Sequence, residues 1–431
     1  MTNSFSRATQ FLRSPRFPIF MIVFVDVLGL GITLPVLPLF AKNQLHAEAW
    51  QITSLTSLYF AAQFFASPWL GRWSDRFGRR PVLILSQVGT LAALLISGSA
   101  PTIRWLYLAR LIDGLTGGNI SVAQAYLSDI TDERNRARGL GTVNAAFGLG
   151  FVFGPAFGGL VASYFGPRVP FFVAAAVSLA TILLSIFLLP ESLSRERRKL
   201  DQAASARAPQ RRGWALLRVP SVALLLLVAF LSQFSFFAFQ TIYVLWAERM
   251  IFPGMPDAYV QRAIGAILTL VGLFGIATQF WFVGPLVKRF GEKKLVVGGY
   301  LARTVAFGAM TLWPALAVVV GVVPLLSIGG GVALPALIAL LTYAAPPDGR
   351  GQVIGLNQSA SAIGSVAGPI LSGFLFERVH PNASMGAAAV LMGLAVLVGL
   401  GIFRLPMHQP TPDTVPAAAT ASALDRVVDA E

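Results

Sequence analysis

The stretch GRWSDRFGRR at residues 71–80, together with its partial copy GPLVKRFGEK at residues 284–293, decides how this chain is organised. The two stretches lie 213 positions apart in a chain of 431 residues, and each contains Arg-Phe-Gly, ending at Gly78 and Gly291. A repeat spaced at about half the chain length predicts two related halves.

A second repeat supports this duplication at an offset of 214 residues. The first copy and its match are Gly141, Gly150, Gly154 and Pro155 with Gly355, Gly364, Gly368 and Pro369. Duplicated halves in a membrane protein predict a binding site between them and alternating access by rocking.

Composition indicates that lipid is the main solvent of the chain. Hydrophobic residues make up 55% and charged residues only 12%, too few to cover a soluble domain. The chain has no cysteine and three scattered histidines, so we expect no disulfide, no metal site and no cofactor. Neither a nucleophile–base pair nor a G-x-x-x-x-G-K-[ST] motif is visible, which argues against an enzyme and against ATP as the energy source.

Hydropathy predicts an all-α membrane protein with twelve spans, because a spanning helix needs about 20 mostly apolar residues. The six spans of the first half are Phe17–Phe40, Gln51–Leu70, Pro81–Ala100, Trp105–Tyr126, Gly139–Tyr164 and Val169–Leu189. Those of the second half are Ser221–Trp246, Ile264–Val287, Leu295–Trp313, Leu316–Tyr343, Gly351–Phe376 and Ala383–Phe403. The predicted domains are a bundle at 1–190, a basic linker at 191–219, a second bundle at 220–406 and a disordered tail at 407–431.

The distribution of basic residues predicts the orientation. With both termini cytoplasmic, the cytoplasmic segments hold 25 of the 33 Lys and Arg residues and the opposite loops hold six. The net charge of +14 is therefore interpreted as a topology signal toward anionic lipid, not as a nucleic-acid surface. We expect a multi-pass protein of the bacterial inner membrane and a monomer.

Several motifs resemble the major facilitator superfamily, specifically its twelve-span drug:proton antiporters. Residues 71–80 fit G-x-x-x-D-R-x-G-R-R, and GFVFGPAFGG at 150–159 fits the antiporter pattern G-x-x-x-G-P-x-x-G-G. LARLIDGLTGG at 108–118 is similar to the arginine motif of the fourth span, and VDVLGLGITLPVLP at 25–38 to the first-span signature. DRFGRRPVL, GPLVKRFGEK and LPES are closest to the tetracycline-efflux group. The resemblance implies the two-bundle fold and export driven by protons.

The chain also departs from the tetracycline-efflux pattern, which implies an acid in the third span, a histidine in the eighth and an aspartate in the ninth. The third span here has no acid, and Gly275 and Arg303 stand at the other two positions. We therefore do not expect metal-chelated tetracycline as the substrate.

Four charged residues lie inside predicted spans, where each is costly and needs a reason. They are Asp26, Arg110, Asp113 and Arg303, and mutual pairing can offset much of the cost. Asp26 is predicted to carry the coupled proton; the alternative is a permanent pair. Arg110 and Asp113 share a helix face, so Asp113 either neutralises Arg110 or titrates. Arg303 is either structural or attracts an anionic substrate group.

The loop after the second span is predicted to be a cytoplasmic latch; an ordinary topogenic loop is the alternative. The resemblance implies that Asp75 meets the N-terminus of the eleventh span near Gly351, and Arg79 could reach Asp129. Such contacts would stabilise the outward-facing state. In the second copy Lys288 and Glu292 reverse these charges. The predicted latch residues are Gly71, Asp75, Arg76, Gly78, Arg79, Arg80 and Asp129.

Small residues of the fifth span are predicted to allow close helix packing, either as a seal between the halves or as simple packing. They are Gly150, Gly154, Pro155, Gly158 and Gly159. Amides and aromatic rings suited to an amphipathic molecule form the predicted substrate site, with core or lipid packing as the alternative for the rings. They are Tyr59, Gln63, Asn119, Gln124, Gln233, Phe237, Gln240 and Tyr243.

The sequence thus predicts a proton-coupled antiporter that exports a small amphipathic organic compound, such as a drug. The alternative within transport is a proton symporter that imports a nutrient such as a sugar or organic acid. A transport-dead sensor or scaffold would need neither Asp26 nor the repeated halves.

Overall fold

The computed structural model describes residues 16–117, 119–131, 133–193, 213–346 and 349–405. The predicted tail at 407–431 and linker residues 194–212 lie outside these ranges. The helices of the first half are α2 (Arg16–Leu45), α3 (Ala49–Phe77), α4 (Arg79–Ser99), α5 (Ile103–Thr116), α6 (Asn119–Ile130), α7 (Glu133–Phe165) and α8 (Val169–Leu188). The second half comprises η1 (Gly213–Arg218), α10 (Pro220–Met250), α11 (Asp257–Ala277), η2 (Thr278–Phe282), α12 (Val283–Leu312), α13 (Leu316–Gly321), α14 (Val323–Ala344), α15 (Arg350–Arg378), α16 (Pro381–Leu400) and η4 (Gly401–Arg404).

These helices make twelve spans, as predicted. By length and hydropathy alone, nine candidate spans are found in the described residues. One of them, Asp257–Leu312, contains two spans joined at Gly291. The more polar α3 adds the second span, and the pair α5 and α6, which is split into two short helices, adds the fourth.

The two copies of the repeated loop share an unusual backbone conformation. Gly78 ends α3 with φ 111°, and Gly291 interrupts α12 with φ 72°. Residues with a Cβ disfavour this region, so the repeat preserves glycine where each half turns sharply between two spans.

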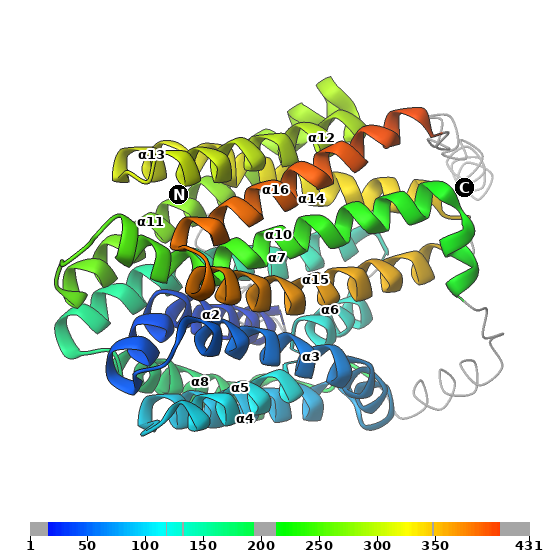
Figure 1. Ribbon diagram of the computed structural model, residues 1–431. Helices are drawn as coiled ribbons and strands as arrows, with labels where there is room; N and C mark the ends of the chain where they lie inside the picture. The colour runs from blue at the N-terminus through cyan, green and yellow to red at the C-terminus, as the bar shows by residue number, and fades with distance from the viewer. Residues whose placement is uncertain (1–15, 118, 132, 194–212, 347–348, 406–431) are drawn as a thin grey trace, which may run out of the picture.

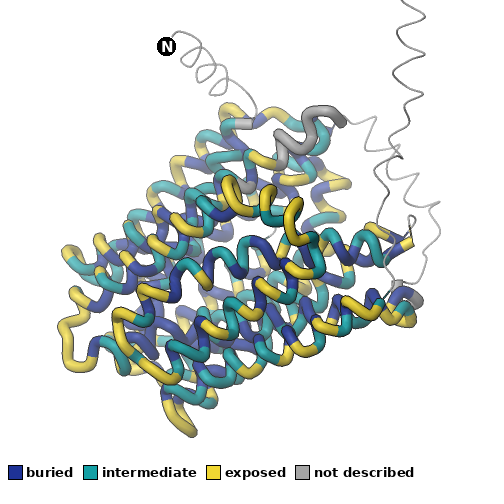
Figure 2. Tube along the Cα trace, turned by 90° about the horizontal axis from the view of Figure 1, so that it is seen from above, coloured by how far each residue is buried: buried dark blue, intermediate teal, exposed yellow. Residues whose placement is uncertain are grey.

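The two halves pack side by side as helical bundles. Figure 1 shows α4, α5 and α8 along the lower edge and α12, α14 and α16 along the upper edge, with α2, α3, α10 and α15 between them. Buried positions gather between the helices (Figure 2), whereas Phe65, Phe187 and Trp281 are more than two-thirds exposed. Such apolar exposure suits a surface that faces lipid.

The repeat extends to helix packing within each half. A Cβ added at Gly154 of α7 would lie 2.7 Å from Gly31 Cα of α2, and one at Gly368 of α15 would lie 2.6 Å from Phe234 O of α10. The first and fifth spans therefore pack as the seventh and eleventh do. Both contacts need a residue without a side chain, because the helix backbones nearly touch.

Most polar contacts between the halves lie at one end of the molecule; deeper along the seam, Ser57 Oγ of α3 donates to Val366 O of α15 at 2.7 Å. We call the end with residues 71–80 the latch end and the end with the loops at 46–48, 251–256 and 379–380 the far end. Lys42 Nζ lies 2.7 Å from the Glu248 carboxylate at the far end, and Asn43 Nδ2 donates to Asp257 Oδ2 at 2.9 Å. Trp50 N also donates to Glu377 Oε2 at 3.2 Å. Within the described residues, no ion pair joins the halves at the latch end.

Candidate functional site

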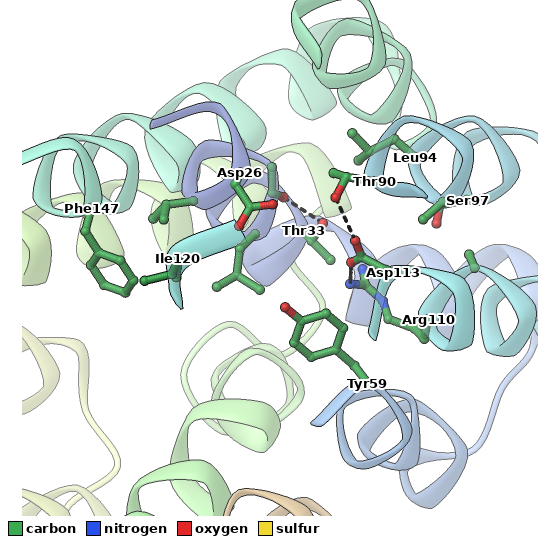
Figure 3. A pocket seen from close by; sticks show the side chains of 15 residues that line it. Asp26, Thr33, Tyr59, Thr90, Leu94, Ser97, Arg110, Asp113, Ile120 and Phe147 are labelled. Carbon is green, nitrogen blue, oxygen red and sulfur yellow. Dashed lines mark hydrogen bonds and ion pairs between the residues drawn. The ribbon is translucent and has the colours of Figure 1, made fainter. Parts of the chain in front are cut away.

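A pocket in the first half collects the predicted charged residues of its spans. Asp26 of α2, Tyr59 of α3, and Arg110 and Asp113 of α5 all line it. In Figure 3 the three charged side chains surround one space, and the Tyr59 hydroxyl points into it. Two carboxylates and one guanidinium therefore share this pocket.

Arg110 and Asp113 form an ion pair on one face of α5. Arg110 Nη1 lies 3.4 Å from Asp113 Oδ2, and Thr90 Oγ1 of α4 donates to Asp113 Oδ1 at 3.2 Å. Arg110 is 8% exposed, so the pair is largely removed from solvent. Both Asp113 oxygens thus have a partner, and Thr90 of the third span supplies a hydroxyl to this carboxylate.

The fourth span is interrupted beside this pocket, which sequence reasoning missed. The first helix ends at Thr116, and Gln63 Nε2 of α3 donates to Gly117 O at 2.6 Å. Ser86 Oγ of α4 donates to Thr116 O. Interrupted spans are tolerated where other groups satisfy the freed carbonyls. Gln63, predicted to contact substrate, thus supports the break, and Gly117–Gly118 in the sequence was the available signal.

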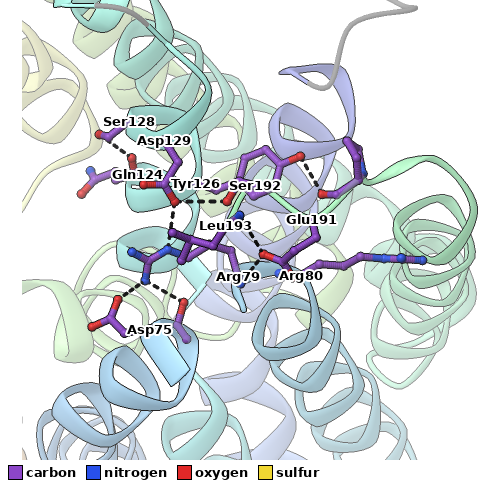
Figure 4. A network of polar contacts seen from close by, with 12 residues as sticks. Asp75, Arg79, Arg80, Gln124, Tyr126, Ser128, Asp129, Glu191, Ser192 and Leu193 are labelled. Atoms are coloured by element: carbon purple, nitrogen blue, oxygen red, sulfur yellow. Dashed lines mark hydrogen bonds and ion pairs between the residues drawn. The ribbon is translucent and has the colours of Figure 1, made fainter. Parts of the chain in front are cut away.

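Arg79 is the centre of the predicted latch. Its Nε lies 3.1 Å from Asp129 Oδ2, the contact expected from the sequence, and its Nη1 lies 2.5 Å from Asp75 Oδ1 (Figure 4). Asp75 remains 59% exposed, and no contact with α15 is recorded for it in the described part of the chain. The latch residues therefore hold α3, α4 and α6 together within one half in this conformation.

Glu191, just after α8, completes this network. Its Oε1 accepts from the backbone N of Arg79 at 2.9 Å, and its Oε2 accepts from that of Arg80 at 3.3 Å. These are the first residues of α4, where free N–H groups and the helix dipole favour an anion. Glu191 belongs to the LPES motif of the sequence. Its partner Arg79 lies 112 positions earlier in the chain, so the motif alone did not predict this contact.

The glycines of the fifth span divide between two partners. Gly150, Gly154 and Gly158 contact α2 of the same half, whereas Gly159 contacts Gln261 and Gly265 of α11 in the other half. Pro155 contributes its carbonyl next to Gly265. Most of the motif therefore packs a bundle internally, and its last glycine lies at the seam between the halves.

The predicted substrate residues separate into several places. Phe237 of α10 contacts Phe60 of α3 across the seam, with ring centroids 4.5 Å apart, and Gln233 lies nearby against Gly364. Gln240 is half-buried on the same face of α10. Tyr243 is buried in the core between Phe239 and Trp246. Gln124 is exposed near Asp129 at the latch end (Figure 4), and the side chain of Asn119 lies outside the described set.

Arg303 contacts other residues than the three remaining charges inside the spans. Its guanidinium carbon lies 4.6 Å from the centroid of the Phe236 ring, and its Nε donates to Leu326 O at 3.4 Å. Both partners belong to the second half, whereas Asp26 and Asp113 line the pocket of the first. Arg303 therefore lies in the other half from Asp26, Arg110 and Asp113.

Metal-ligand side chains do not cluster anywhere in the described residues, where no group of three His, Cys, Asp or Glu comes together.

These features define a two-bundle membrane transporter with charged residues at its centre. The Major Facilitator Superfamily model matches residues 19–261 and 244–426, and the chain belongs to this family.

Named relatives agree with the tetracycline-efflux resemblance. The chain is 32% identical to the class C tetracycline resistance protein of Escherichia coli, covering 88% of this chain and 92% of that one. It is 29% identical to multidrug resistance protein 2 of Bacillus subtilis (strain 168), with the same coverage. The human organic anion transporter MFSD10 (TETRAN) shares the fold, with a TM-score of 0.65 and 22% identity over 89% of this chain and 98% of that one.

Proposed function

We propose that this protein is a proton-driven antiporter that exports a small amphipathic organic compound by alternating access. The observation that carries the proposal is that three charged residues of apolar helices, Asp26, Arg110 and Asp113, line one pocket. A buried acid is costly in a membrane and usually functional. Relatives named for tetracycline and multidrug resistance favour export of a drug-like compound.

Asp26 is the proposed proton carrier. Its helix, α2, packs through Gly31 and Leu28 on the glycines of α7, and α7 also contacts the other half through Gly159. Rocking of the halves would therefore change the surroundings of Asp26, including its access to water. A carboxylate whose surroundings alternate in this way can bind a proton on one side of the membrane and release it on the other.

The proposed orientation places both termini and the latch end in the cytoplasm of a bacterial cell, in its inner membrane. The Lys42–Glu248 pair and its neighbours then close the outer side, which corresponds to an inward-facing conformation. Asp75, which is exposed here, would engage the N-terminus of α15 when the cytoplasmic side closes.

The test uses the purified full chain in liposomes with a pH-sensitive dye inside and an imposed pH gradient. Tetracycline without divalent metal, norfloxacin, ethidium and 2-naphthoate are added one at a time. Proton movement opposite to an added compound, absent in Asp26→Asn, is the expected result. Movement in the same direction would indicate the symport alternative, and silence with all four compounds would count against proton-coupled drug export.

A further inference from the structure

The second half contains a cation that the proposed proton pathway does not use. Arg303 lies near the middle of the ninth span, which follows Gly291 in α12. Its guanidinium lies over the Phe236 ring of α10 and next to α14, where a Cβ at Gly330 would overlap it. The glycines of α14 thus leave a recess that this side chain occupies.

The acidic side chains of the second half that the structure describes lie at its two ends, away from Arg303. Glu248, Asp257 and Glu377 contact residues of the first half at the far end, and Glu292 belongs to the loop at the latch end. No ion pair of Arg303 is recorded within the described residues, in contrast to Arg110, which has Asp113. Arg303 therefore places a positive charge inside the bundle, and no carboxylate among the described residues forms an ion pair with it.

The hydrogen bond of Arg303 to Leu326 O uses Nε, so the two terminal nitrogens are not needed for that contact. The Arg303 residue is half-buried. A guanidinium with free terminal N–H groups matches the two oxygens of a carboxylate.

Aromatic rings connect this cation to the seam between the halves. Phe236 packs against Phe237 with centroids 5.3 Å apart, and Phe237 packs against Phe60 of the first half. A flat apolar molecule at the seam could therefore lie against these rings while its charged group reaches Arg303.

We infer that Arg303 and Phe236 form a subsite for the carboxylate of an aromatic organic anion. This inference rests on the proposed function and deepens it by assigning the charge of the substrate. The depth of Arg303 within its span separates this subsite from the headgroup region, so the anion is a transported molecule and not a lipid phosphate.

The test compares matched probes that differ in charge. Binding of 2-naphthoate, 2-naphthamide and 2-naphthylmethylamine to the purified full chain is measured by isothermal titration calorimetry at pH 7.5. We expect the carboxylate to bind at least tenfold more tightly than the amide, and the amine to bind most weakly. An equal or reversed order, or no binding of the carboxylate, would overturn the inference, whatever the variants do.

Variants then assign the effect to this residue. Arg303→Gln should weaken 2-naphthoate at least tenfold and leave 2-naphthamide within twofold, and Arg303→Lys should be intermediate. Arg262→Gln is the matched control, because Arg262 also lies over a ring, that of Tyr164, but on the exposed surface of α11. Unchanged 2-naphthoate affinity in folded Arg303→Gln would contradict the inference. Because binding needs no gradient, this result is independent of proton coupling.

Discussion

Lys42 Nζ lies 2.7 Å from both carboxylate oxygens of Glu248, and this pair joins α2 of the first half to α10 of the second at the far end. The Asn43–Asp257 hydrogen bond reinforces it at 2.9 Å. Because the latch end lacks an ion pair between the halves in the described residues, these contacts favour the conformation described here.

Removing the Lys42–Glu248 pair should shift the conformational equilibrium. Partly exposed ion pairs contribute about 0.2–1 kcal/mol, so Lys42→Met should raise the population open at the far end by up to about fivefold. The chain has no cysteine, so labels at introduced cysteines replacing Thr102 and Ala315 are unique, and distances between them can be measured by pulsed electron spin resonance. The double variant Lys42→Glu with Glu248→Lys, which exchanges the two charges, should restore the wild-type distance distribution. An unchanged, wild-type distribution in Lys42→Met would contradict the role of the pair.

Gly159 and Gly373 occupy equivalent places on either side of the seam. Gly159 of α7 faces Gln261 O of α11, and Gly373 of α15 faces Trp50 and Thr53 of α3. Alanine at either position would overlap its neighbour, and overpacking costs about 1–3 kcal/mol. We expect slower transport and a lower Tm for both variants. Gly141→Ala, on α7 but with no atom within 4 Å of the added Cβ, should leave both unchanged. Equal effects of Gly141→Ala and Gly159→Ala would argue against the seam contact.

Two residues of the latch network should affect different properties: Asp75 the transport rate, and Glu191 the thermal stability. Asp75 is exposed, so Asp75→Asn should leave the Tm within about 2 °C while strongly reducing transport, because it acts in the other conformation. The Tm of each variant is measured by thermal unfolding, and its transport rate in liposomes. Full transport by Asp75→Asn would indicate that the loop has only a topological role.

Glu191→Gln removes the anion at the start of α4 and should lower the Tm. An anion at a helix N-terminus contributes about 0.3–1 kcal/mol, and up to about 2 kcal/mol where it is partly buried.

Asp113 is expected to serve as the counter-ion of Arg110, since both of its oxygens have partners. Asp113→Asn should therefore lower the Tm and slow transport while keeping the number of protons moved for each substrate molecule. That ratio is measured in liposomes: the pH-sensitive dye reports the protons moved, and labelled substrate reports the molecules transported. A lost proton signal in Asp113→Asn with a normal one in Asp26→Asn would transfer the proton-carrying role to Asp113.

The sequence was sufficient for the fold because its signals are local. Apolar length predicts most of the spans, and Gly78 and Gly291 recur at the same point of each half with positive φ. The split of the fourth span was missed, since Gln63 and Ser86 satisfy its free carbonyls from other helices.

The candidate site was predictable in its charges but not in its contacts. Asp26, Arg110 and Asp113 are conspicuous in apolar helices, and the structure places them in one pocket. Their separation from Arg303 depends on long-range packing, as does the core position of Tyr243. Residue type and helical spacing alone could not distinguish a ring in the core from one at the seam.

The central claim is that Asp26 couples substrate movement to protons. The most direct measurement compares exchange of labelled substrate between equal concentrations with uphill transport driven by a pH gradient, in the same liposomes. The substrate is the compound that gives the largest proton signal among the four tested. Asp26→Asn should retain exchange, which requires no net proton movement, and lose uphill transport. Undiminished uphill transport by this variant would contradict the account.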